Sequence, residues 1–202
     1  MPIRVAELPP LTLALTLACA AVSAAAACGR CSATDLALSF PLIARGQLWR
    51  LLTPFAYVDG LSMRFMAHLY AFSHFSAALE AGYYAGRGAA YALALFGGLA
   101  AMLAGCLAAP DLEQPFLMTP LAFFVVRLWA AGEPHTSVEV FGPLCTSSTM
   151  LPYALLGGLT LFTGGAAAMP ALLGIGAAVF VDCWRPDVAL SAPARAPAAA
   201  AA

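Results

Sequence analysis

The sequence predicts an all-α polytopic membrane protein with six helices crossing the bilayer. Hydrophobic residues make up 62% of the 202 positions and charged residues only 9%. Soluble domains carry about 25% charged residues, so a soluble fold of this composition would expose large apolar patches. Several apolar runs approach the roughly 20 residues that a helix needs to cross a bilayer. The net charge of −1 offers no basic surface for nucleic acid.

The first helix is expected over about residues 8–27, after Pro9 and Pro10, because a missing backbone donor is tolerated where a helix begins. Arg4 before it and small residues at its end are also typical of a cleavable signal peptide. The apolar run is long for a signal peptide, which favours a retained helix. Residues 28–61 are too polar to cross the bilayer and too apolar to extend freely into water.

Five more apolar runs predict the remaining helices, with the loop AGEPHTSVEVFG between the fourth and the fifth. A transmembrane domain would then cover residues 1–185, and the Ala/Pro-rich residues 186–202 are expected to be disordered. Six crossings place both termini on one side, and a small excess of arginine favours the cytosol for that side. The helices are expected over about residues 62–81, 88–109, 115–131, 150–163 and 167–184.

The histidines give little support for catalysis or metal binding. Gly60-Leu61-Ser62 is the only Gly-x-Ser of the chain, and none of its three histidines lies in the last two predicted helices. A serine protease needs a base within reach of its nucleophile, so no Ser/His pair is expected. His68 and His74 are six residues apart and do not share a helix face. We therefore predict no catalytic residues, no metal site and no cofactor.

Polar and small residues at helix ends are the stronger signal. Glu80 and Arg87 flank a short turn that contains Gly82 and Gly86. Ionisable groups at the edge of a membrane are costly, so the pair is interpreted either as an ion pair that pins the turn or as part of a site. Small residues in the later helices, such as Gly157, are expected to let helices pack closely.

The stretch GQLWRLLTPFAY, residues 46–57, predicts an amphipathic element that lies in the membrane interface between helices one and two. Trp49 suits the boundary between lipid and water. Arg50 is expected to extend to the headgroups while its stem stays among leucines.

Four stretches, in order over about residues 40–176, resemble the derlin family; one of them is the fourth helix, PLAFFVVRLW, and the other three contain the motifs below. The first motif resembles the derlin Gln-x-Trp-Arg-x-x-Thr-x-Phe loop, the second its Leu-Glu-x-Gly turn with a following Gly-Arg, and the third its Phe-Gly and Leu-Pro-x-x-Leu-x-Gly stretch. The matching positions are Gln47, Trp49, Arg50, Thr53 and Phe55; Leu79, Glu80, Gly82, Gly86, Arg87, Ala89 and Tyr91; and Phe141, Gly142, Leu151, Pro152, Leu155 and Gly157.

The sixth helix departs from the family pattern. Derlins usually carry Gly-x-x-x-Gly-His there, whereas this chain has Gly174 followed by Ala178 and Val179. Ala178 is small enough to permit the same close packing of helices.

The resemblance implies a rhomboid-like bundle that lacks the catalytic Ser/His pair, in the endoplasmic reticulum membrane with both termini cytosolic. It also implies a role in endoplasmic-reticulum-associated degradation, in which misfolded lumenal or membrane proteins return to the cytosol. The partners expected from it are these misfolded substrates, a ubiquitin-ligase complex, an oligomer with itself or another chain, and a cytosolic AAA ATPase reached indirectly. The resemblance leaves two alternatives: preprotein import across an outer membrane of a secondary plastid, and an active rhomboid-type intramembrane protease.

Short helices suggest how such a protein would act. The fifth predicted helix has only about 14 apolar positions, and a short hydrophobic span is accommodated by local thinning of the bilayer. A thinner membrane lowers the cost of moving an unsatisfied backbone through lipid. We therefore hypothesise that the protein assists retrotranslocation by thinning the bilayer.

Overall fold

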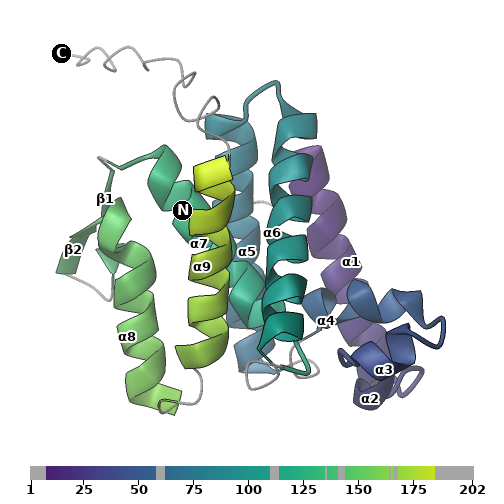
Figure 1. The fold of residues 1–202 in the computed structure, drawn as a ribbon. Helices are drawn as coiled ribbons and strands as arrows, with labels where there is room; N and C mark the ends of the chain where they lie inside the picture. Colours follow the sequence, from purple (N-terminus) through teal and green to yellow (C-terminus); the bar gives the residue numbers. More distant parts are fainter. Residues whose placement is uncertain are drawn as a thin grey trace, which may run out of the picture.

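The computed structural model describes residues 8–57, 62–109, 114–134, 136–140, 144–163, 165 and 168–184. Its main body is a bundle of six helices of 13 to 21 residues (Figure 1). Each begins and ends within a few residues of a predicted range. The helices are α1 (Pro10–Ala27), α5 (Met63–Ala78), α6 (Gly88–Ala108), α7 (Met118–Gly132), α8 (Leu151–Thr163) and α9 (Ala168–Trp184).

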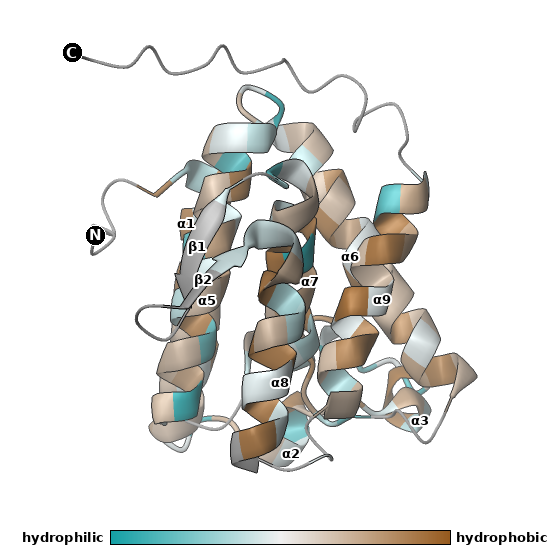
Figure 2. Ribbon diagram, turned by 90° about the vertical axis from the view of Figure 1, so that its left-hand side faces the viewer, coloured by the Kyte–Doolittle hydropathy of each residue, from teal (hydrophilic) through white to brown (hydrophobic). Residues whose placement is uncertain are grey.

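Two of these helices, α1 and α6, are long and apolar enough to cross a membrane by length and composition, and α7 and α9 are shorter apolar helices. Figure 2 shows hydrophobic residues along the long helices, with most of the hydrophilic residues near their ends. The first turn of α1 and the last turn of α9 lie at the same end of the bundle (Figure 1). The predicted disordered tail, residues 186–202, lies outside the described residues.

Helix α7 forms the centre of the bundle. Of its fifteen residues, eleven are buried, and they cover every face of the helix. It packs against α5, α8 and α9, and also against α4 (Thr53–Ala56). A helix that is apolar on every face is either buried in protein or in contact with lipid, and the neighbours of α7 make it the buried helix of this bundle.

The loop predicted after the fourth helix contains a small antiparallel hairpin within the otherwise all-α fold. Strands β1 (Ser137–Val140) and β2 (Leu144–Ser147) pair with Ser137 opposite Ser147. The alternation of polar residues and valine in β1 is the period-2 pattern of a strand. A short 3-10 turn, η5 (Ser148–Met150), then leads into α8.

Residues 28–57 fold into a layer of short helical turns at the opposite end of the bundle from the first turn of α1 (Figure 1). Backbone hydrogen bonds join this layer to the segment before α7: Leu38 N donates to Pro115 O at 2.9 Å and Leu117 N to Pro54 O at 2.8 Å. The layer contains α2 (Ala33–Leu36), α3 (Phe40–Ile43), the 3-10 turn η2 (Leu48–Leu51) and α4. None of these turns is long enough to cross a bilayer.

Candidate functional site

Arg50, the charged residue of the GQLWR motif, is buried at 5% exposure. Its Nη1 donates to Thr34 O at 2.6 Å and to Ala37 O at 3.0 Å, and its Nε donates to Gln47 Oε1 at 2.6 Å. Both carbonyls belong to the C-terminal end of α2, where helix carbonyls lack partners. Arg50 therefore caps α2 from a distance in sequence, and Gln47 holds the guanidinium in place.

The threonine of the same motif completes this cap. Thr53 Oγ1 donates to Leu36 O at 3.1 Å, which satisfies another carbonyl at the end of α2. Asp35 lies 3.8 Å from the guanidinium, but its side chain is 65% exposed, so this ion pair contributes little. The motif thus ties the segment around η2 to the segment around α2.

The expectation that Arg50 extends to the lipid headgroups is wrong, because unpaired carbonyls inside the layer bind its guanidinium. The apolar residues beside it point outward instead: Leu48, Trp49 and Leu52 are 64%, 55% and 59% exposed. A surface with one tryptophan and two leucines is suited to the membrane interface. The segment therefore has its polar group inside and its apolar groups outside.

A second cluster, here called the polar knot, consists of Thr12, Ser76, Glu80 and Tyr91. The Glu80 carboxylate accepts from Leu11 N at 3.1 Å, from Thr12 N at 2.8 Å and from Thr12 Oγ1 at 2.7 Å. These amides are in the first turn of α1, which has no side-chain cap of its own. A carboxylate is favoured at a helix N-terminus, so Glu80 acts as the missing cap.

Two further hydrogen bonds complete the polar knot. The hydroxyls of Thr12 and Ser76 are 2.8 Å apart, and those of Ser76 and Tyr91 are 2.6 Å apart. Thr12, Ser76 and Tyr91 are all fully buried. The polar knot therefore joins α1, α5 and α6 at one end of the bundle. Of the two interpretations offered for Glu80, an ion pair with Arg87 or part of a site, its carboxylate contacts with α1 favour the second.

The backbone changes form at this point in the chain. Helix α5 continues into a π-helical turn, η3 (Leu79–Tyr83), which contains Glu80 and Gly82. Such turns are rare and are frequent at functional sites. Arg87 Nη2 donates to Tyr83 O at 3.0 Å and so closes the turn. Gly86 has a φ of +73°, which requires glycine.

The small residues expected to pack helices have different surroundings. A Cβ at Gly174 on α9 would collide with the backbone carbonyl of Pro120 on α7, and Ala178 is fully buried. Among the described residues, a Cβ at Gly157 on α8 would meet nothing within 4 Å. Close approach of α7 and α9 therefore depends on Gly174, and no such contact involves Gly157 in the described part of the chain.

Ser62 and His68, which were considered for catalysis, have structural partners, whereas the buried Nδ1 of His74 has no hydrogen-bond partner among the described residues. Ser62 Oγ caps α5 by accepting from Phe65 N at 3.2 Å. His68 bonds through Nδ1 to Arg64 O at 2.7 Å and through Nε2 to Thr119 Oγ1 at 3.1 Å. His135 lies outside the described residues. Within the described ranges, no group of three or more His, Cys, Asp or Glu residues could hold a metal ion.

Sequence reasoning missed Thr12, Ser76 and the ion pair between Arg127 and Asp182, which are 3.5 Å apart and join α7 to α9. A threonine or serine in an apolar helix gives almost no signal by itself. Asp182 offered one, because a carboxylate inside an apolar helix needs a partner.

The profile of the Der1-like family matches residues 8–191. The chain belongs to the Der1-like family. Derlin-1 of Arabidopsis thaliana is 29% identical over 171 residues, which cover 84% of this chain and 63% of the relative. Derlin-1 of Oryza sativa subsp. japonica is 30% identical over 141 residues, covering 69% and 57%. A probable derlin-2 homolog of Dictyostelium discoideum is 27% identical over 155 residues, covering 74% and 61%.

These comparisons confirm the resemblance to derlins. This Der1-like chain spans about three fifths of the length of the curated relatives it matches. The matched region contains both the cap that Arg50 forms on α2 and the polar knot. These two sites, one at each end of the bundle, are therefore the candidate functional features of the family domain in this chain.

Proposed function

We propose that this Der1-like protein is a non-catalytic component of endoplasmic-reticulum-associated degradation that assists the retrotranslocation of misfolded proteins. In this proposal all six long helices cross the endoplasmic reticulum membrane, with both termini cytosolic. Its partners are misfolded lumenal or membrane proteins and a ubiquitin-ligase complex, and the pulling force comes from a cytosolic AAA ATPase recruited indirectly. The protein itself makes and breaks no covalent bond.

The observation that carries the proposal is the unequal length of the helices. Helix α6 has 21 residues and rises about 31 Å, which matches a hydrocarbon core of about 30 Å. Helix α8 has 13 residues and rises only about 20 Å. A bilayer that contacts both must become thinner beside α8, at a cost of fractions of a kcal/mol per Å.

The layer of residues 28–57 supports the same mechanism. It presents Leu48, Trp49 and Leu52 on its surface, and these side chains are suited to insertion among headgroups. The cap that Arg50 forms on α2 keeps this layer folded. Two effects then act together: the bilayer is thinner beside α8, and the layer of residues 28–57 disturbs the headgroups at its own end of the bundle. Both lower the free-energy barrier to moving a polypeptide through lipid, where its backbone groups would be unsatisfied.

The proposal is tested in cells by the turnover of a misfolded model substrate. The double variant Trp49→Ala/Arg50→Ala should insert into the membrane but leave the substrate undegraded, because the layer loses both its anchor and its internal cap. The matched control is Arg45→Ala, which removes an exposed arginine from the same layer and should leave degradation unchanged. Normal turnover with the double variant would overturn the proposal.

The location of the tagged protein tests the cellular address separately. Overlap with an endoplasmic reticulum marker is expected. Overlap with a marker of a secondary plastid membrane would instead assign the same fold to preprotein import.

A further inference from the structure

An apolar cavity of about 350 Å³ lies between α1 and α6. Leu15, Cys19 and Val22 of α1 line one wall, and Leu95 and Leu99 of α6 line the other. Phe72 of α5, which is 1% exposed, also lines the cavity. We call this cavity the α1–α6 slot. Its two long walls belong to the helices that are long and apolar enough to cross a membrane, and residues 52, 53, 55 and 56 of the α4 segment also line it.

The slot is held open by contacts at both ends of α1. At the first turn of α1 the polar knot fixes Thr12 to Glu80, with 2.7 Å between Thr12 Oγ1 and Glu80 Oε2. Near the other end, Ser23 Oγ donates to Ala56 O at 3.4 Å. Between these points α1 packs chiefly on α5 and α4, and only 17% of the helix is buried. Helix α1 is thus fixed at both ends, which prevents it from closing onto α6.

The dimensions of the slot select its occupant. Its α1 wall runs from Leu11 to Val22, a rise of about 16 Å, which is about half of the 30 Å hydrocarbon core and therefore one leaflet. A helix of that length with side chains, about 10 Å across, fills roughly 1,200 Å³, far more than the slot holds. Apolar cavities do not retain water. A single extended hydrocarbon chain matches the slot in length and polarity.

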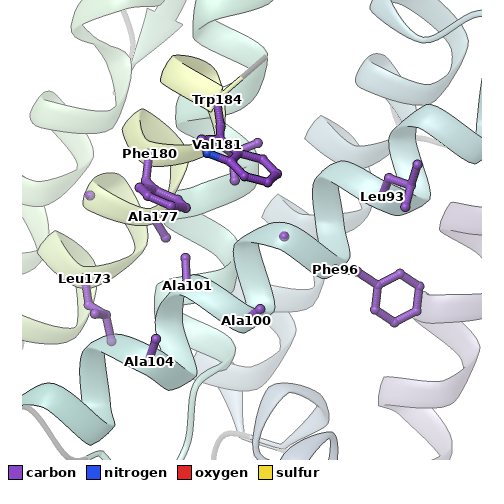
Figure 3. Close-up of a pocket in the computed structure, with 12 residues that line it drawn as sticks. Leu93, Phe96, Ala100, Ala101, Ala104, Leu173, Ala177, Phe180, Val181 and Trp184 are labelled. Carbon is purple, nitrogen blue, oxygen red and sulfur yellow. The ribbon is translucent and has the colours of Figure 1, made fainter.

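We propose that the α1–α6 slot binds one acyl chain of a membrane phospholipid. Phospholipid chains are the solvent around α1 and α6 in the bilayer, so mass action favours them over any scarce ligand. Phe96 stands at the lip of the slot: Figure 3 shows it pointing away from Trp184 and Phe180 of α9, toward the neighbouring helix on the far side of α6. The bound chain fills the space between α1 and the bundle and leaves the headgroup at the surface.

This inference rests on the membrane-spanning arrangement in the proposed function, but it is tested on purified protein without a degradation assay. The protein is reconstituted in phosphatidylcholine vesicles that contain a phospholipid with a photoactivatable group in mid-chain. After illumination, mass spectrometry locates the labelled residues. We expect label on Phe72 and Cys19, which are 1% and 6% exposed, in addition to the label on lipid-facing residues such as Leu107.

Variants that fill the slot give the second arm. Ala92→Phe and Ala18→Leu add bulk to opposite walls and should abolish the label on Phe72 and Cys19 while the label on Leu107 remains. Ala104→Phe is the matched control, because Ala104 faces the separate groove between α6 and α9 in Figure 3 and should leave the pattern unchanged. Size-exclusion chromatography identifies variants that fail to fold, and Ala18→Leu decides if Ala92→Phe fails.

Label confined to lipid-facing residues in the unmodified protein would overturn the inference, as would unchanged label on Phe72 in a folded variant with a filled slot. Crosslinking of Phe72 to a second copy of the chain would also overturn it, since it would identify a protein occupant. None of these results would affect the proposed function, which is judged by substrate turnover.

Discussion

The hydroxyl of Thr12 allows the polar knot to be tested one bond at a time. In the structure it donates to Glu80 Oε2 at 2.7 Å and lies 2.8 Å from Ser76 Oγ. Thr12→Val removes this hydroxyl and preserves the shape of the side chain, while Glu80→Ala removes the acceptor. Thr16→Val is the matched control on the same helix, because the Thr16 hydroxyl donates to Thr12 O within α1.

The expected magnitude follows from these contacts. A hydrogen bond to a charged group contributes about 1.5 to 3 kcal/mol in soluble proteins, whereas polar pairs between membrane helices average about 0.6 and reach about 1.7 kcal/mol. Because Thr12 and Glu80 are both buried, we expect a coupling free energy of about 1 to 2 kcal/mol between Thr12→Val and Glu80→Ala. Coupling of Thr16→Val with Glu80→Ala should stay within about 0.5 kcal/mol.

Reversible unfolding of the purified protein in bicelles measures the four free energies of each double-mutant cycle. The control cycle shows how much of the effect comes from removing any hydroxyl from α1. If the cycle of Thr12→Val with Glu80→Ala also gave a coupling free energy near zero, the Thr12 hydroxyl would not bind the Glu80 carboxylate and would not help to hold α1 to the bundle.

Two further predictions concern the cap on α2 and the contact between α7 and α9. Arg50→Lys should lose at least one hydrogen bond to α2, a cost of about 1.5 to 3 kcal/mol, and limited proteolysis within residues 28–57 should become faster, whereas Arg45→Lys should have no effect. Gly174→Ala should destabilise the protein by about 1 to 3 kcal/mol because its Cβ collides with Pro120, whereas Gly157→Ala should stabilise α8 by up to about 1 kcal/mol. Thermal unfolding measures the stability of both variants. Equal effects of the two alanines would contradict the packing described.

The six long helices could be predicted from the sequence because apolar runs alternate with polar or Gly/Pro-containing stretches along the chain. The direction in which Arg50 points could not, since its acceptors on α2 come close only in the folded layer. The role of Thr12 could not be predicted for a related reason. A single hydroxyl in an apolar helix does not indicate that it will bind a carboxylate 68 residues away in the chain. Gly157 and Gly174 are the same residue type in similar helices, and only the fold distinguishes their neighbours.

The central claim is that the bilayer is thinner beside α8 than beside α6. Spin labels at Leu161 on α8 and Leu107 on α6, which are 86% and 65% exposed, would report lipid order and membrane depth on the two faces of the reconstituted protein. The mechanism predicts lower lipid order and a shallower hydrocarbon region at the Leu161 label. Equal order and equal thickness at the two labels would contradict it.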